Sequence, residues 1–156
     1  MKDIDPIDCK ILNELQKDGR ISNAELSEKI NLSPSATAER TKRLQKDGYI
    51  KGYFAKLSPS KLNKALMVFI EVKLNRTDVN VFNEFNQAVQ KSAEIMECHM
   101  LAGGFDYLIK ARVKDMDSYR NFLGDVLLSL PGVRETHTYP VMEEVKDSNI
   151  IAIDSF

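Results

Sequence analysis

The sequence predicts an α+β fold with two parts, three helices within residues 1–57 and a β-α-β-β-α-β unit within residues 65–156. Two observations lead to this prediction. Helix-capping residues and helically spaced apolar residues recur before Gly48, whereas β-rich runs alternate with helical segments after it. Residues 58–64, which begin with Ser-Pro-Ser, are predicted to form the linker between the two parts.

The first predicted helix begins after Asp5, with Pro6 at its first position, where the missing N–H is tolerated. Apolar residues then recur at helical spacing as far as Gly19, which gives the helix one apolar stripe. The stripe consists of Ile7, Ile11, Leu12 and Leu15.

Two further helices follow, joined by a turn of three residues. Ser22 with Glu25 three residues later forms a capping box, which predicts a helix over 23–30. Ser33 then caps a longer helix that starts at Pro34. Two helices joined in this way form the helix-turn-helix geometry, in which the second helix enters the DNA major groove.

The second helix of this pair has a polar face that suits DNA. A helical wheel places Thr37, Ala38, Thr41, Leu44 and Gln45 on one side, and Ser35, Ala36, Glu39, Arg40, Lys42 and Arg43 on the other. Three cations against one carboxylate suit phosphates and guanine edges, although a lone charged face could also be merely solvated. The capped helix before it and Gly48 after it favour DNA. The predicted DNA-binding residues are Ser33, Ser35, Ala36, Thr37, Glu39, Arg40, Lys42 and Arg43.

The second part of the chain is predicted to be a ferredoxin-like domain. Residues 49–57 read as a strand or short hairpin, which would make the first domain winged. The elements expected after the linker are strands in 65–74, 95–102, 107–113 and 133–145, and helices over 78–93 and 115–128. Asp78, Phe82 and Phe85 match Asp115, Tyr119 and Phe122 at a constant offset of 37, which indicates a duplicated β-α-β unit.

A four-stranded sheet with both helices on one face leaves its other face open. The apolar residues of these strands are too numerous for all of them to face water, so a second copy of the domain is the expected cover. These residues are Ile95, Met96, Met100 and the apolar positions of 66–74. A dimer would also present two recognition helices to half-sites about one DNA turn apart.

Composition limits the remaining classes. The chain has 156 residues, 43% hydrophobic and 29% charged, with a net charge of −1, which argues against a generally basic nucleic-acid coat. No apolar run approaches the roughly 18 residues of a membrane span, and the acidic start is unlike a signal peptide, so a cytoplasmic location is expected. Cys9 and Cys98 lie far apart with no metal-ligand spacing, so neither a disulfide framework nor a metal site is expected.

Three segments together resemble the Lrp/AsnC family of transcription regulators, in particular its leucine-responsive branch. They read NLSPSATAERTKRLQKDGYI, LAGGFDYLIKARV and LPGVRETHTYPVMEEVK. The resemblance covers about Ile4 to Ser148 and implies a DNA-binding regulator of amino-acid metabolism. It also implies that dimers assemble into larger rings such as octamers, and that an amino acid such as leucine acts as the effector.

The resemblance also implies where the effector binds, between dimers at the turn that joins the second and third strands. The residues carried over are Ala102, Gly103, Gly104, Phe105, Asp106, Met116, Thr136, Tyr139 and Val141. Glycines let a backbone approach a ligand carboxylate, and Asp106 could pair with the ammonium group. Without the resemblance, the same residues could equally be an ordinary hairpin turn with a polar neighbour.

Two other classes of function stay open. His99 and His137 lie in predicted strands, and siroheme decarboxylases resemble this family while using the cavity of the ferredoxin-like domain for catalysis. The other alternative is an effector-binding scaffold without DNA contact. We expect a regulator and not an enzyme, with no cofactor besides the effector, because the cationic helix face is retained.

Overall fold

The computed structural model describes residues 4–75 and 80–153, which belong to two compact units. The helical unit comprises the chain up to Lys56 together with the segment that begins at Lys146. The sheet unit spans Leu57–Val145. The sequence analysis had assigned the whole stretch after residue 64 to the second domain. The grouping of the last segment with the helical unit corrects that boundary.

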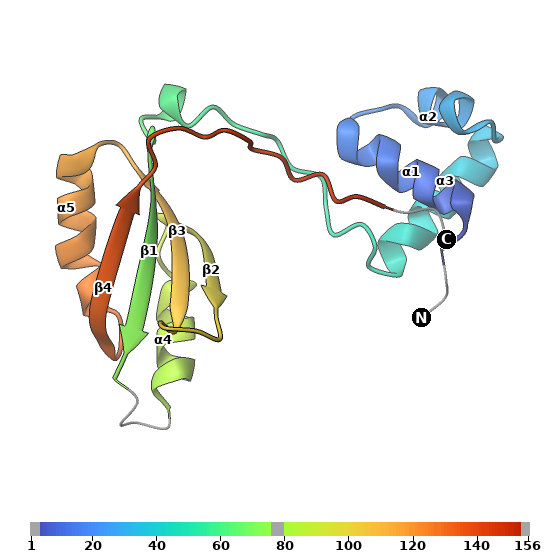
Figure 1. The fold of residues 1–156 in the computed structure, drawn as a ribbon. Coiled ribbons are helices and arrows are strands. Elements are labelled where there is room, and N and C mark those ends of the chain that lie inside the picture. Colours follow the sequence, from blue (N-terminus) through green and yellow to red (C-terminus); the bar gives the residue numbers. More distant parts are fainter. Residues whose placement is uncertain (1–3, 76–79, 154–156) are drawn as a thin grey trace. The chain divides into compact units, whose positions relative to one another are not determined.

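Three helices form the helical unit, α1 (Pro6–Lys17), α2 (Asn23–Ile30) and α3 (Pro34–Lys46) (Figure 1). Each helix begins directly after the capping residue that the sequence indicated, which is Asp5, Ser22 or Ser33. The carboxylate of Asp5 accepts hydrogen bonds from the backbone N–H groups of Ile7 and Asp8, and Ser22 caps α2. These caps satisfy backbone donors that a helix start otherwise leaves without partners.

The turn between α2 and α3 is fixed by local hydrogen bonds. Asn31 ends α2 in the left-handed conformation, with φ of 56°, and Ser33 caps α3. The Asn23 side chain donates to the carbonyl of Pro34 at 2.8 Å and so ties the start of α2 to the start of α3. The three helices share a small core made of Ile11, Leu12, Leu26, Ile30 and Leu44.

The strand expected within residues 49–57 does not form. This stretch is neither helix nor strand. The backbone N–H groups of Tyr49 and Ile50 donate to the carbonyl of Leu44, where they close the C-terminus of α3. The side chains of both residues pack against the helical core. The start of this segment is therefore held by hydrogen bonds to the end of α3 and by packing on the helical core. We had expected it to be held by pairing with another strand.

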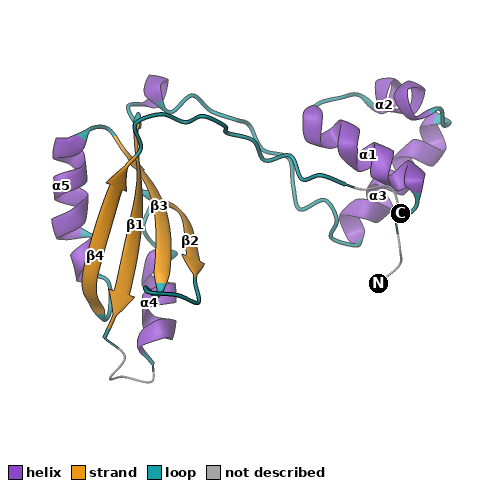
Figure 2. Cartoon of the chain, viewed as in Figure 1, coloured by secondary structure: helices purple, strands orange, loops and turns teal. Residues whose placement is uncertain are grey.

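The sheet unit contains four antiparallel strands in the order β2-β3-β1-β4 (Figure 2). The strands are β1 (Leu66–Leu74), β2 (Ile95–Met100), β3 (Tyr107–Val113) and β4 (Val133–Pro140). A short 3₁₀ helix, η1 (Ser60–Leu62), precedes them, within the predicted linker. With its two helices this is the predicted β-α-β-β-α-β order of a ferredoxin-like domain.

Both helices of this unit, α4 (Val81–Val89) and α5 (Met116–Asp125), pack on the same face of the sheet. Phe85 and Phe122, which the offset of 37 matched, are both buried against the strands. Asp78 lies outside the described residues. The helices end earlier than expected, and a 3₁₀ turn η2 (Leu127–Ser129) follows α5. The last strand ends at Pro140, whose ring nitrogen has no hydrogen to donate, although we expected it to reach residue 145.

The strand register corrects the expectation of a largely apolar open face. Val68, Ile70, Val72 and Leu74 of β1 are buried under the two helices, and Ile95 packs against the same core. The alternate positions of the strands form the open face, which carries the apolar residues Met67, Phe69, Leu108 and Tyr139 and the charged residues Glu71, Lys73, Glu97, Lys110 and Glu135. Because the pleat alternates, most of the apolar residues counted in β1 face the helices, and only Met67 and Phe69 of this strand lie on the open face. The open face is therefore mixed in character, with cross-strand ion pairs such as Lys110 with Glu97 at 2.8 Å.

Candidate functional site

The outer surface of α3 presents small and polar side chains. Ser35, Glu39 and Lys42 are exposed, and Ala36 is half-buried near the start of the helix. Ser33 is exposed too, and its hydroxyl caps α3 by accepting from the N–H of Ala36. These positions have the size and polarity that suit contacts with base edges and phosphates.

Two other positions of α3 differ from the helical wheel, and Thr37, which the wheel placed on the inner side, differs from the list of predicted DNA-binding residues. Thr37 was predicted to bind DNA, but it is fully buried, and its hydroxyl donates to the carbonyl of Ser33 at 2.9 Å. A side chain in the core cannot reach a base, so Thr37 is removed from the interface. Ala38 and Gln45 were placed on the inner side, yet both are exposed. The helical wheel used apolar residues to identify the inner side of the helix. Because α3 has few apolar residues, that side was poorly defined and these two residues were misplaced.

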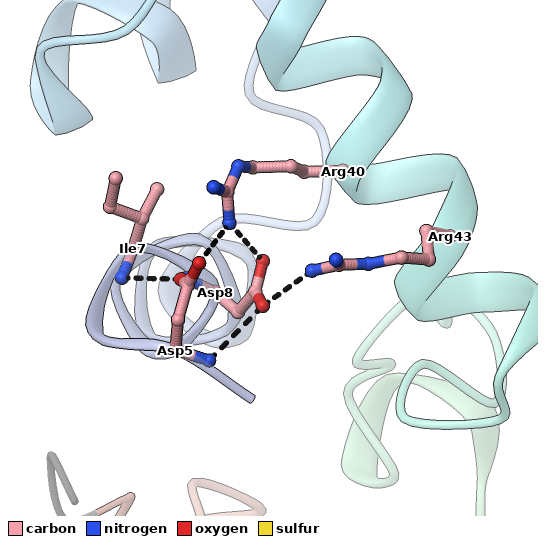
Figure 3. A network of polar contacts seen from close by, with 5 residues as sticks. All are labelled: Asp5, Ile7, Asp8, Arg40 and Arg43. Atoms are coloured by element: carbon pink, nitrogen blue, oxygen red, sulfur yellow. Dashed lines mark hydrogen bonds and ion pairs between the residues drawn. The ribbon is translucent and has the colours of Figure 1, made fainter. Parts of the chain in front are cut away.

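Arg40 and Arg43 are directed toward α1 and bind its acidic start (Figure 3). Nη1 of Arg40 donates to Asp5 at 2.5 Å and to Asp8 at 3.0 Å. Nη2 of Arg43 donates to the other oxygen of Asp8 at 2.5 Å. The Asp8 side chain is 1% exposed, whereas those of Arg40 and Arg43 are 27% and 43% exposed.

This network changes the charge of the predicted recognition face. Two guanidinium groups meet two carboxylates, so the cluster is neutral overall. The hydrogen bond from Arg40, opposed in part by burial, lowers the pKa of Asp5, and the same bond raises the pKa of Arg40. The count of three cations against one carboxylate is therefore corrected, because Asp5 and Asp8 offset Arg40 and Arg43. Of the three cations, Lys42 and Arg43 are exposed, with Arg43 bound to Asp8.

A second candidate site lies at the loop between β2 and β3. A cavity of about 570 Å³ opens there, beside the end of β1 and the start of β4. Its lining includes three of the predicted effector residues, Gly104, Phe105 and Asp106, and two cations, Lys73 and Arg134. The remaining lining residues are Leu74 and Asn75. Both cations lie beside Glu135, Lys73 at 3.2 Å and Arg134 at 3.9 Å, and their N–H groups are donors that suit a carboxylate ligand.

Asp106 has a structural role in this cavity. Its side chain is buried, with 5% exposure, and one carboxylate oxygen accepts the backbone N–H of Leu74 at 2.8 Å. Its own N–H donates to the carbonyl of Val72. Asp106 therefore anchors the loop to β1. The sequence analysis had suggested Asp106 as the partner of a ligand ammonium group and did not indicate this structural role.

The other predicted effector residues do not line this cavity within one subunit. Tyr139 pairs with Phe69, and the N–H of Val141 donates to Met67, so both lie toward the opposite end of β1. Met116 starts α5, which follows that same end of β3. Thr136 pairs with Val72, one strand away from the loop. Ala102 and Gly103 precede the lining residues in the loop itself.

The two histidines and Cys98 offer little catalytic chemistry. His99 and His137 are both exposed, and each has a glutamate of its own strand beside its ring, Glu97 and Glu135 respectively. Burial raises the pKa of the Cys98 thiol to about 11, so the nucleophilic thiolate is scarce at neutral pH. Among the described residues, no group of three or more His, Cys, Asp or Glu side chains could hold a metal ion.

The segment after residue 146 was not singled out by the sequence, yet it contacts α1. The Gln16 side chain forms two hydrogen bonds with the backbone of Ile151, donating to its carbonyl at 3.1 Å and accepting its N–H at 2.7 Å. Ile153 packs against the helical core. The clustered apolar residues 150–153 were the signal that could have indicated this contact.

None of the helices in the described ranges is long and apolar enough to cross a lipid bilayer.

Together, the capped helix pair and the cavity in a ferredoxin-like domain define a two-domain regulator with a DNA-binding module and a ligand-binding module. Family models match both parts. Residues 4–51 match a winged helix-turn-helix DNA-binding family, and residues 67–151 match the Lrp/AsnC ligand-binding domain. The chain belongs to the Lrp/AsnC family of transcription regulators.

Relatives and solved structures extend this likeness over nearly the whole chain. This chain is 58% identical over 152 residues to the leucine-responsive regulatory proteins of Escherichia coli K12 and Klebsiella pneumoniae. The match covers 97% of this chain and 93% of each relative. A transcriptional regulator of Neisseria meningitidis, solved as a complex with L-Met, is 37% identical and superimposes with a TM-score of 0.92, over 96% of this chain and 97% of the other. An AsnC family regulator of Agrobacterium tumefaciens gives a TM-score of 0.91 at 27% identity and the same coverage.

Proposed function

We propose that this protein regulates genes of amino-acid metabolism in the cytoplasm by binding DNA through α3 and an amino acid at the β2–β3 loop. The observation that carries the DNA part is the outer face of α3, which follows a fixed turn and presents Ser35, Glu39 and Lys42 to solvent. We add the exposed Ala38 and Gln45 to the proposed contact residues. Ser33 and Ala36 stay in the proposal at the helix start, beside the positive end of its dipole.

Selection of bound duplexes from a random pool tests the DNA contact and yields the preferred site. Lys42→Ala should weaken binding to that site and lessen its salt dependence, because one phosphate contact contributes a slope of about 0.9. Lys10→Ala is the matched control, since Lys10 is an exposed lysine of α1 and lies outside the proposed face. Equal losses for the two variants, or no binding by the unmodified protein, would contradict the proposal.

For the effector, we propose an amino acid whose carboxylate lies near Lys73 and Arg134 at the cavity of the β2–β3 loop. The likeness to proteins named for leucine, and to a regulator solved with L-Met, supports leucine and methionine as the first ligands to test. Met116, Thr136, Tyr139 and Val141 would have to come from other parts of an assembly, because a single subunit does not bring them to this cavity.

Gly104→Ala tests this site without disturbing the fold. A Cβ built at Gly104 meets nothing within 4 Å, so the variant should fold as the unmodified protein does. The added methyl group would occupy space beside the loop that the ligand is proposed to use. Calorimetry with leucine and methionine should then show at least a tenfold loss of affinity in the variant. Unchanged affinity would place the effector elsewhere.

We also propose that the protein forms dimers through the open face of the sheet, and that dimers assemble further, up to octamers. Half-buried Phe69 beside Tyr139 forms the apolar part of that face, and Tyr139 is 51% exposed in the single subunit. Tyr139→Glu should shift the mass toward the monomer in analytical ultracentrifugation, since it puts a carboxylate beside Glu71. The control is Leu128→Glu, at an exposed position on η2.

The two alternatives make different predictions. A siroheme decarboxylase-like enzyme would carry porphyrin absorbance after purification, and its histidines would have to serve that chemistry. Both histidines are exposed beside glutamates of the same strand, which favours the regulator. An effector-binding scaffold would bind the amino acid but recover no sequence from the duplex selection.

A further inference from the structure

The start of α1 shows an arrangement that a DNA-binding role for α3 does not by itself require. Asp8 is both part of the capping box of α1 and a partner of α3 (Figure 3). One of its carboxylate oxygens accepts from Arg40, and the other accepts from Arg43 and from the N–H of Asp5 at 3.2 Å. A carboxylate that is 1% exposed is thus bound from two positions on one face of α3.

The spacing of Arg40 places it on the side of α3 that faces the other helices, whereas Arg43 is 43% exposed and reaches Asp8 with its guanidinium group. Thr37 and Leu44 are fully buried, and Arg40 lies between them at helical spacing. A position of this kind in a small core is usually occupied by an apolar side chain. Apolar packing has no preferred direction, whereas charge-assisted hydrogen bonds to a fixed carboxylate have a strict geometry.

Rotation of α3 about its own axis is the movement that this geometry restricts. Side-chain ends lie about 5–6 Å from the axis of a helix, so a rotation of about 20° moves them by about 2 Å. A hydrogen bond to a base edge tolerates only a few tenths of an ångström. Holding α3 from two points one turn apart therefore decides whether Ser35 and Glu39 meet their bases and whether Lys42 meets its phosphate.

We propose that Asp8 is a positioning residue for DNA recognition, which sets the rotation of α3 by clamping Arg40 and Arg43. Because the clamp also offsets their charge, it lowers the attraction of α3 for any DNA while it sharpens contact with the right sequence. The clamp therefore gives selectivity at the expense of general affinity. This inference rests on the proposed DNA contact of α3.

The test compares Asp8→Asn with the unmodified chain on two duplexes, the site selected by the unmodified protein and a random sequence of equal length. Binding is measured over a salt series, at temperatures where circular dichroism shows both proteins folded. We expect affinity for the selected site to fall at least tenfold. Affinity for the random duplex should rise two- to fivefold with a steeper salt slope, because one negative charge is lost beside two guanidinium groups.

Glu14→Gln is the matched control. Glu14 also lies on α1, but it pairs with Lys17 at 2.7 Å and with Lys29 at 3.0 Å, and it does not contact α3 through these bonds. It removes the same charge, so its effect on the random duplex should be similar. The ratio between the two duplexes should change less than twofold.

Asp5→Asn keeps the test decisive if Asp8→Asn fails to fold. Asp5 contacts Arg40 alone of the two arginines, its side chain is 44% exposed, and asparagine can still cap α1. The selectivity ratio should fall about two- to fivefold. An unchanged ratio in a folded variant, or equal losses on both duplexes, overturns the inference. Failure of the unmodified chain to bind any duplex would instead overturn the proposed function.

Discussion

Leu44→Ala should unfold the helical unit while the sheet unit stays folded. Leu44 is 1% exposed and packs with Ile11, Leu12, Leu26 and Ile30, which form the buried apolar core of the described helical unit. The change removes three carbons, each contributing about 0.8 kcal/mol on burial. With the cavity left behind, the expected loss is about 3–4 kcal/mol. A core of this size supplies about 3–5 kcal/mol of net stability, so most of it would be lost.

Thermal unfolding followed by calorimetry checks this prediction. The unmodified protein should show a helical transition that the variant lacks or shows at much lower temperature. The transition of the sheet unit should not move, because its core is separate and much larger. DNA binding should be lost while amino-acid binding is kept.

Leu62→Ala is the control, since Leu62 is 56% exposed on η1 and its truncation should change stability by less than about 0.5 kcal/mol. The reasoning is refuted if Leu44→Ala lowers both transitions together, or if it costs less than about 1 kcal/mol.

Three further predictions concern pH, thiol reactivity and one glycine. The pKa of Asp5 is lowered by Arg40, so its contribution to stability is present above its ordinary value of 3.8 and is lost as the pH falls below it. Melting temperatures between pH 7 and pH 3 should therefore fall less steeply in Asp5→Asn, and parallel curves would contradict this. A thiol pKa of about 11 predicts that Cys98 reacts slowly with a disulfide reagent at pH 8 until urea unfolds the protein. Equal rates before and after urea would be inconsistent with its burial. Gly132→Ala should cost about 2–4 kcal/mol, because φ is +72° and the added Cβ would lie 2.0 Å from a methyl carbon of Val81. Gly124→Ala, with nothing within 4 Å, is its control, and equal melting temperatures for the two would refute the argument.

The sequence by itself determined most of the segments that form helices and strands in both parts of the chain. Helix caps and the spacing of apolar residues depend on neighbours within a few residues, so the sequence alone reveals them. The caps are Asp5, Ser22 and Ser33, and the spacing is that of the duplicated unit around Phe85 and Phe122. The motifs also indicated the family. Where the local signal was weak, as in residues 49–57, the expected strand did not form.

Only the tertiary structure decided where the charged side chains of α3 and of the β2–β3 loop point. The inward turn of Arg40 and Arg43 depends on Asp8, which lies 32 and 35 residues earlier in the chain. The Asp106 side chain, in the β2–β3 loop, is held by the backbone of Leu74 in β1, and the contact of Gln16 with Ile151 spans 135 residues. Charged side chains are long and can point either way on a helix or loop. Their direction is therefore set by partners that the chain brings near only when it folds.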